Sequence, residues 1–131
     1  MYQLLGGSFS DRVRLFRVIS RDEPEAMVER LLEYREEGFV QYQMKVGDNV
    51  AVDIERMHAV AGQKLDTETI AADAHTGWRQ HEGMRAVAAI DELPIYLEQP
   101  CATFDECLVL RRASSRPFIL DEIIDSKELR R

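Results

Sequence analysis

One lysine and three acidic residues stand at regular intervals along the chain, each at the end of a short, largely apolar stretch. They are Lys45, Asp73, Glu98 and Asp121, separated by 28, 25 and 23 residues. Carboxylates that converge repel one another and stay ionised when a cation joins them. Hard divalent cations prefer oxygen ligands, and Mg²⁺ is commonly held by carboxylates with positions left open for water or substrate. These residue types therefore predict a divalent-cation site beside a lysine.

The intervals match an alternation of strand and helix patterns. Strands are predicted at residues 13–20, 39–47, 69–73, 94–98 and 117–124. Amphipathic helices are predicted at residues 21–38, 49–62, 79–93 and 103–115, and a further helix begins at 125–131. Such alternation predicts parallel strands with right-handed crossovers. The carboxyl ends of parallel strands share one edge of a sheet, which is where α/β proteins place their active sites.

Two α/β architectures fit this alternation, an open doubly wound sheet and a (β/α)₈ barrel. An open sheet that binds a dinucleotide usually has a glycine-rich first turn, and none follows Ser20 or Gly47. In the second strand Gln41, Gln43 and Lys45 share one face. That polar face is unusual for a central parallel strand, since such strands are usually apolar on both faces.

Composition limits the classes of function. The chain has 131 residues, of which 45% are hydrophobic, enough for one domain with a core. Its net charge of -7 argues against a nucleic-acid partner. The sequence has neither an apolar run of membrane-spanning length nor a signal peptide, so we expect a cytoplasmic protein without a membrane partner. Cys101 and Cys107 lack the spacing of a zinc site and are expected to be reduced thiols.

Six short motifs in succession resemble one known family. They are "YQLLGG", "QMKVG", "DIERMHAV", "DAHTGW", "YLEQP" and "LDEII". In this order and spacing they are similar to motifs of the enolase superfamily, in its mandelate racemase/muconate lactonizing enzyme branch. The resemblance implies an α/β fold, a partial TIM (β/α)₈ barrel with about the first five strands and four helices. Residues 1–131 would form the N-terminal part of the barrel domain.

The resemblance also implies a chemistry. Asp73, Glu98 and Asp121 would be Mg²⁺ ligands, and Lys45 would be the acid/base at the α-carbon of a small carboxylate substrate. Metal and lysine together would allow α-proton abstraction through an enediolate. The outcome would be racemisation, epimerisation or dehydration, on proline-like or on hydroxy and amino acids.

The chain departs from the family motifs at two positions. Gln43 stands where the motif has its first lysine, and His75 stands where it has an asparagine. Alternation points the side chain of Glu122 away from that of Asp121. We expect Gln43, His75 and Glu122 to support the ligands or to face the substrate.

Length sets a further expectation. A whole barrel needs about 250 residues, so the chain is expected to be a fragment of a larger enzyme, without the capping domain and the later barrel strands. The alternative is a non-catalytic half-barrel that binds metal weakly or is purely structural. Unpaired edge strands favour association, so we expect self-association or a homo-oligomer.

Overall fold

Strands and helices alternate along the chain, as the sequence patterns predict. The computed structural model describes residues 2–7 and 12–124, so the helix expected at 125–131 lies outside the described residues. The strands are β1 Arg17–Ile19, β2 Gln41–Lys45, β3 Thr69–Asp73, β4 Tyr96–Glu98 and β5 Phe118–Ile119. The helices are α1 Pro24–Glu36, α2 Val50–Ala61, α3 Gln80–Ile90 and α4 Phe104–Arg112, preceded by a 3₁₀ helix, η1 Tyr2–Leu5.

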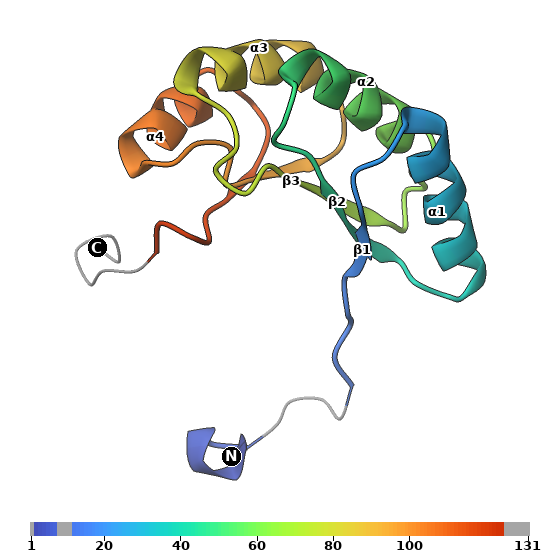
Figure 1. Ribbon diagram of the computed structural model, residues 1–131. Helices are drawn as coiled ribbons and strands as arrows, with labels where there is room; N and C mark the ends of the chain where they lie inside the picture. Colours follow the sequence, from blue (N-terminus) through green and yellow to red (C-terminus); the bar gives the residue numbers. More distant parts are fainter. Residues whose placement is uncertain (1, 8–11, 125–131) are drawn as a thin grey trace.

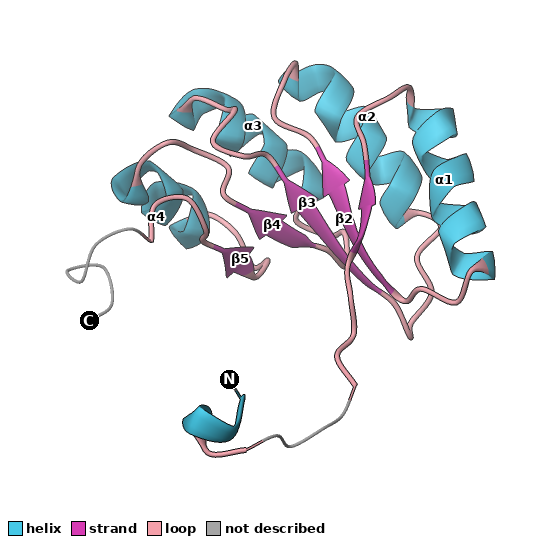
Figure 2. Cartoon of the chain, turned by 60° about the horizontal axis from the view of Figure 1, so that its bottom comes forward, coloured by secondary structure: helices cyan, strands magenta, loops and turns pink. Residues whose placement is uncertain are grey.

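The order of the strands decides between the two architectures. The sheet runs β1-β2-β3-β4-β5, and each strand is parallel to its neighbours. In a doubly wound sheet the order reverses and helices cover both faces. Here α1 to α4 all lie on one face of the sheet, side by side in sequence order (Figure 1, Figure 2). This is the arrangement of a partial (β/α)₈ barrel, as expected.

The core lies between the sheet and its helices. Along β2 the side chains alternate, with Tyr42 and Met44 fully buried and Gln41, Gln43 and Lys45 only partly buried. The buried side chains pack under the helices, and the polar ones lie on the opposite, concave face. This explains the polar face of β2, because in a barrel that face points to the interior and is not covered by a second layer of helices.

Local signals in the sequence begin the helices where they are observed. Pro24 occupies the first turn of α1, where its missing N–H is not needed. Asn49 caps α2 by accepting a hydrogen bond from the Ala51 amide. Thr103 and Glu106 form the expected capping box at the start of α4. None of these helices has the length and apolar content that a membrane crossing requires.

Four of the five strands are shorter than predicted, and the shortening is largest in the two outer strands, β1 and β5. Residues 13–16 do not join β1, which pairs only through Arg17–Ile19 and has Ile19 as its one buried side chain. The fifth strand ends at Ile119 rather than at Asp121, because its pairing with β4 stops where β4 ends at Glu98. Both are the outer strands of the described sheet, and each pairs on one side. Hydrophobic alternation alone overestimated how far these outer strands would pair.

A charged cluster closes the amino-terminal end of the sheet. Glu68, directly before β3, is 1% exposed in its side chain and binds the Arg35 guanidinium through both carboxylate oxygens, at 2.6 and 2.9 Å. The Leu65 amide and the Tyr42 hydroxyl also donate to Glu68, at 2.8 and 3.3 Å. In barrels this end contributes stability, and the opposite end carries the chemistry.

Candidate functional site

Three of the four predicted site residues lie at one level on adjacent strands. In the parallel register Lys45 pairs with Asp73, and Asp73 pairs with Glu98. Each is the last residue of its strand, at the carboxyl edge of the sheet. The level below consists of residues fully buried against the helices, namely Met44, Ala72 and Leu97. This packed level fixes the three strand ends, so the charged side chains above it project from a rigid base.

Lys45 and Asp73 form an ion pair across β2 and β3. The Lys45 Nζ donates to the Asp73 Oδ2 at 2.5 Å. The Asp73 side chain is 5% exposed and that of Lys45 is 36% exposed. The pair therefore joins a buried carboxylate to an amine whose side chain is accessible to solvent.

Glu98 is held from the other side by Gln43. The Gln43 Nε2 donates to the Glu98 Oε2 at 2.9 Å, across the intervening strand β3. Gln43 pairs in register with Ala71, whose small side chain leaves space above β3. Gln43, at the position of the family's first lysine, thus supports Glu98 with a neutral donor.

Burial raises the pKa of Glu98 above its ordinary value, and the charges of Asp73 and Asp121 raise it further. The hydrogen bond from Gln43 and the charge of Lys45 act in the opposite direction. The net shift is upward, so the carboxylate is less stable here than in water. Glu98 is therefore close enough to Asp73 and to Asp121 for the charge of each to oppose its ionisation.

Asp121 lies in the turn after β5 rather than at its end. The strand stops at Ile119, and the Asp121 amide donates to the Gln99 Oε1 at 2.9 Å. Gln99 itself is fully buried, has a φ of 36°, and donates through its Nε2 to the Cys101 carbonyl at 2.9 Å. The prediction that Asp121 ends the strand was wrong, and a buried glutamine from the β4–α4 loop anchors its backbone instead.

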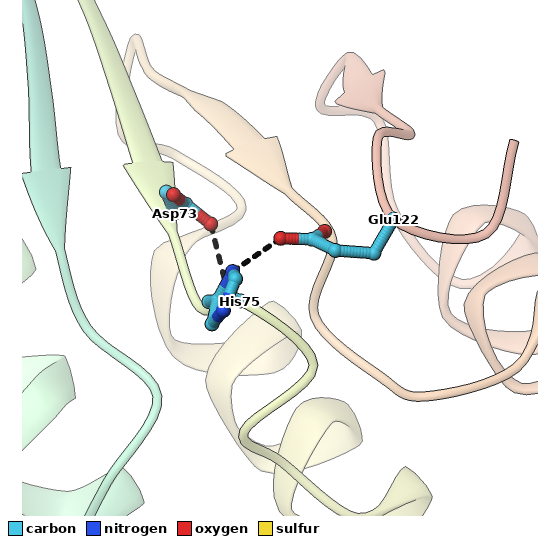
Figure 3. Close-up of side chains that lie close together, drawn as sticks. All are labelled: Asp73, His75 and Glu122. Atoms are coloured by element: carbon cyan, nitrogen blue, oxygen red, sulfur yellow. Dashed lines mark hydrogen bonds and ion pairs between the residues drawn. The ribbon is translucent and has the colours of Figure 1, made fainter.

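His75 and Glu122 meet beside Asp73. The His75 Nδ1 contacts the Glu122 Oε1, and the His75 amide donates to the Asp73 Oδ1 at 2.8 Å (Figure 3). One ligand atom from each of the three residues lies within 4.8 Å of the others. His75 has a φ of 46° and an exposed side chain. The structure thus offers a second, nitrogen-containing group around Asp73. The sequence named His75 and Glu122 as supporting residues but did not predict that they form a group with Asp73.

A cavity of about 470 Å³ opens beside Lys45. It is lined by Lys45 at the end of β2 and by residues of the loops after the first three strands, namely Ser20, Arg21, Val46 and His75. A second cavity of about 240 Å³ lies on the concave face and includes Gln43 and Glu98. Sequence reasoning missed Ser20 and Arg21, which belong to no motif. Position directly after a strand was the one signal that could have found them.

The two remaining histidines and the cysteines lie away from the site chemistry. His58 and His81 are exposed on α2 and α3. Cys101 and Cys107 are buried free thiols. The Cys107 Sγ donates to the Cys101 carbonyl at 3.5 Å. Cys101 lies in the β4–α4 loop and Cys107 lies on α4.

Comparison with known proteins gives one family. Residues 26–130 match the family model described as "Enolase C-terminal domain-like". A cis-3-hydroxy-L-proline dehydratase of Roseibium aggregatum is 43% identical over 125 residues, which is 95% of this chain and 34% of that protein. An N-succinyl-L-Arg/Lys racemase of Bacillus cereus is 30% identical over 135 residues, which is 99% of this chain and 37% of that protein. The chain thus spans about a third of the length of these relatives.

Solved structures agree with this match. A mandelate racemase/muconate lactonizing enzyme of Roseovarius nubinhibens superposes with a TM-score of 0.88 at 33% identity, covering 98% of this chain and 36% of that one. Another such structure from the same organism, complexed with magnesium, superposes with a TM-score of 0.84 at 31% identity. It covers 93% of this chain and 35% of that one.

Proposed function

The chain belongs to the enolase superfamily, in its mandelate racemase/muconate lactonizing enzyme branch, and we propose that it forms the first part of a barrel that removes the α-proton of a carboxylate substrate. The observation that carries this proposal is the level shared by Lys45, Asp73 and Glu98 on adjacent strand ends. It places one amine and two carboxylates side by side at the edge of the sheet where barrel enzymes act. Residues 1–131 are then part of the catalytic domain.

Asp73, Glu98 and Asp121 would hold a magnesium ion. The fit rests on their chemistry, because the charges of Asp73 and Asp121 raise the pKa of Glu98 and a cation would relieve that repulsion. Carboxylate oxygens are the ligands that Mg²⁺ prefers. When bound, the ion would offset negative charge that develops on the substrate carboxylate. A related structure that contains magnesium supports this choice of metal.

Lys45 is the residue proposed to accept the α-proton. Lys45 lines the 470 Å³ cavity, and its amine donates a hydrogen bond to Asp73 at 2.5 Å. A base must reach the proton that it removes, and a group at a cavity wall on a rigid strand meets that condition. Gln43 does not compete for the proton, since a side-chain amide is not a base at neutral pH.

The relatives suggest two classes of substrate. One relative is named for cis-3-hydroxy-L-proline and the other for N-succinylated arginine and lysine, and both are derivatives of α-amino acids. We propose that this chain serves an α-amino-acid derivative of one of these kinds. Loss of a β-hydroxyl after proton removal gives dehydration, and return of a proton to the α-carbon gives racemisation or epimerisation.

Self-association follows from the exposed apolar side chains near β1. Val13, Leu15 and Val18 are 84%, 68% and 42% exposed. Large exposed hydrophobic groups beside an unpaired strand edge favour pairing with another chain. We propose a homo-oligomer, and sedimentation that shows a single monomeric species across the micromolar range would contradict it.

Solvent deuterium exchange tests the function. The 131-residue chain is incubated in D₂O with Mg²⁺ and, in turn, cis-3-hydroxy-L-proline, L-proline, and N-succinyl-L-lysine. Deuterium at the α-carbon, lost in Lys45→Met and kept in the control Lys64→Met between α2 and β3, supports the proposal. Absence of exchange for every compound, with Mg²⁺ bound, would instead favour the non-catalytic half-barrel.

A further inference from the structure

One fully buried carboxylate lies behind the site and takes no part in the proposed chemistry. Asp53 on α2 is 0% exposed. Its Oδ2 accepts hydrogen bonds from the Gly47 and Asp48 amides, at 2.9 and 2.8 Å. The same oxygen accepts from the Trp78 Nε1 at 3.0 Å. Asp53 therefore joins the loop after β2, which follows Lys45, to the loop after β3, which follows Asp73.

Arg56 extends this connection to a third loop. Its Nη1 donates to the Asp53 Oδ1 at 2.9 Å, and its Nε donates to the Asp22 carbonyl at 2.7 Å. Asp22 lies between β1 and α1. The loops after β1, β2 and β3 are the three that line the 470 Å³ cavity beside Lys45. One buried ion pair thus contacts every loop of the cavity wall.

The backbone leaves these loops little freedom to shift. A Cβ at Gly47 would lie 2.0 Å from the Ala74 carbonyl oxygen, and a Cβ at Gly77 would lie 2.1 Å from the Gly47 carbonyl oxygen. The loops after β2 and β3 are therefore in direct backbone contact. A change in the hydrogen bonds at Asp53 has to move both of them, because neither can relax past the other.

We propose that Asp53, together with Arg56, is a positioning residue that sets the three loops around the cavity beside Lys45. This role depends on the proposed function in one respect, namely that the cavity beside Lys45 is where the substrate binds. Asp53 binds two backbone amides, an indole and a guanidinium rather than reacting groups, so it acts through the loops on Lys45 and His75. Removal of the charge of Asp53 therefore loosens the three loops of the cavity wall more than it loosens the sheet beneath them.

A purely structural role of Asp53 would predict a different experimental result. Glu68 is an equally buried carboxylate that also pairs with an arginine and accepts a backbone amide, at the opposite end of the sheet. If both pairs served stability alone, loss of either would loosen the whole domain in the same way. The comparison of Asp53→Asn with Glu68→Gln therefore separates positioning from stability.

Amide hydrogen exchange by NMR on the 131-residue chain, without metal or substrate, measures this difference. In Asp53→Asn we expect the exchange rates of the Gly47 and Gly77 amides, each divided by that of the Ala72 amide in β3, to rise roughly tenfold or more. The reason is that one neutral amide oxygen cannot replace a charged oxygen that accepts three hydrogen bonds. Trp78 is the single tryptophan of the chain, so its indole N–H gives one resonance, which should shift. Glu68→Gln should leave these ratios and that resonance unchanged.

Other outcomes overturn the proposal. Equal acceleration at Gly47 and Ala72, or no change at all, would assign Asp53 to general stability. If Asp53→Asn does not fold, Arg56→Gln is measured by the same ratios, and failure of both to fold would likewise assign the pair to stability. Because no substrate is present, these results are independent of whether the chain catalyses α-proton exchange.

Discussion

Glu68 and Glu98 are buried glutamates at opposite ends of one sheet, and their pKa values are shifted in opposite directions. Burial alone would raise the pKa of Glu68, but hydrogen bonds from Arg35 and the Leu65 amide hold it below the ordinary value. Burial raises the pKa of Glu98, and two neighbouring carboxylates add to that rise. Ionised Glu68 at the amino-terminal end therefore stabilises the fold, whereas ionised Glu98 at the carboxyl-terminal end destabilises it.

Replacement of Glu98 by glutamine should stabilise the fold at neutral pH. A carboxyl group whose folded pKa is raised binds its proton more tightly in the folded state, so stability falls as pH rises from the ordinary value of 4.5 through the raised value. Glu98→Gln removes this loss and keeps an acceptor oxygen for Gln43. Urea unfolding between pH 4 and pH 8 should show a smaller decline with pH in the variant. An identical decline in both proteins would contradict the expected linkage.

Replacement of Glu68 by glutamine should have the opposite effect. A lowered folded pKa stabilises the fold above pH 4.5, and that contribution is lost as pH falls through the folded value. We expect Glu68→Gln to lower the free energy of unfolding at pH 7 by about 2 kcal/mol. This is less than the roughly 3–5 kcal/mol of a fully buried pair because the Arg35 side chain is 25% exposed. The difference from wild type should shrink in acid.

Gly47→Ala should be far more costly than Gly38→Ala. Both glycines have a positive φ, 96° and 92°. A Cβ at Gly47 would collide with the Ala74 backbone, whereas a Cβ at Gly38 would meet nothing within 4 Å. We expect Gly38→Ala to cost about 1 kcal/mol and Gly47→Ala at least about 2 kcal/mol more. Equal losses in chemical unfolding would show that the loops after β2 and β3 are not in close contact in solution.

Metal titration should separate the two ligand groups that share Asp73. Mn²⁺ replaces Mg²⁺ as a probe visible by electron paramagnetic resonance. We expect Asp73→Asn, Glu98→Gln and Asp121→Asn each to weaken Mn²⁺ binding by roughly tenfold or more, about 1.4 kcal/mol. His75→Asn and Glu122→Gln should bind almost as wild type. The exposed Asp66→Asn serves as the control.

A reversed pattern in the same titration would be informative. Loss of binding in His75→Asn and Glu122→Gln, with Glu98→Gln unaffected, would place the cation on the group drawn in Figure 3. The ligands proposed from the strand ends would then be wrong.

The strand-end positions were predictable because they depend on two regular periods. Side chains alternate along a strand, and each βα unit occupies about the same length of chain, so Lys45, Asp73 and Glu98 could be placed at one edge before their contacts were known. Asp121 escaped this reasoning. Its position depends on Gln99, whose buried side chain and positive φ have no period in the sequence.

Asp53 is a second residue whose partners could not be predicted, although its burial could. It falls on the buried stripe of α2 with Val50, Met57 and Val60, so the helical period places a carboxylate among apolar residues. The sequence does not indicate which donors satisfy it. Those donors are two amides of the loop after β2 and the indole of Trp78 in the loop after β3, and they meet only when α2 packs beside α3.

By itself the sequence determined the parallel α/β alternation, the family motifs and the strand ends that carry Lys45, Asp73 and Glu98. The family motifs also predicted the singly wound sheet, which the structure confirms. Tertiary structure alone decided that Gln43 reaches Glu98 across β3 and that His75 meets Glu122. The physical reason is the separation along the chain between the residues that interact. Periodicity and capping act between residues close in the chain, whereas the partners of a buried polar group are chosen by packing between segments that the sequence keeps far apart.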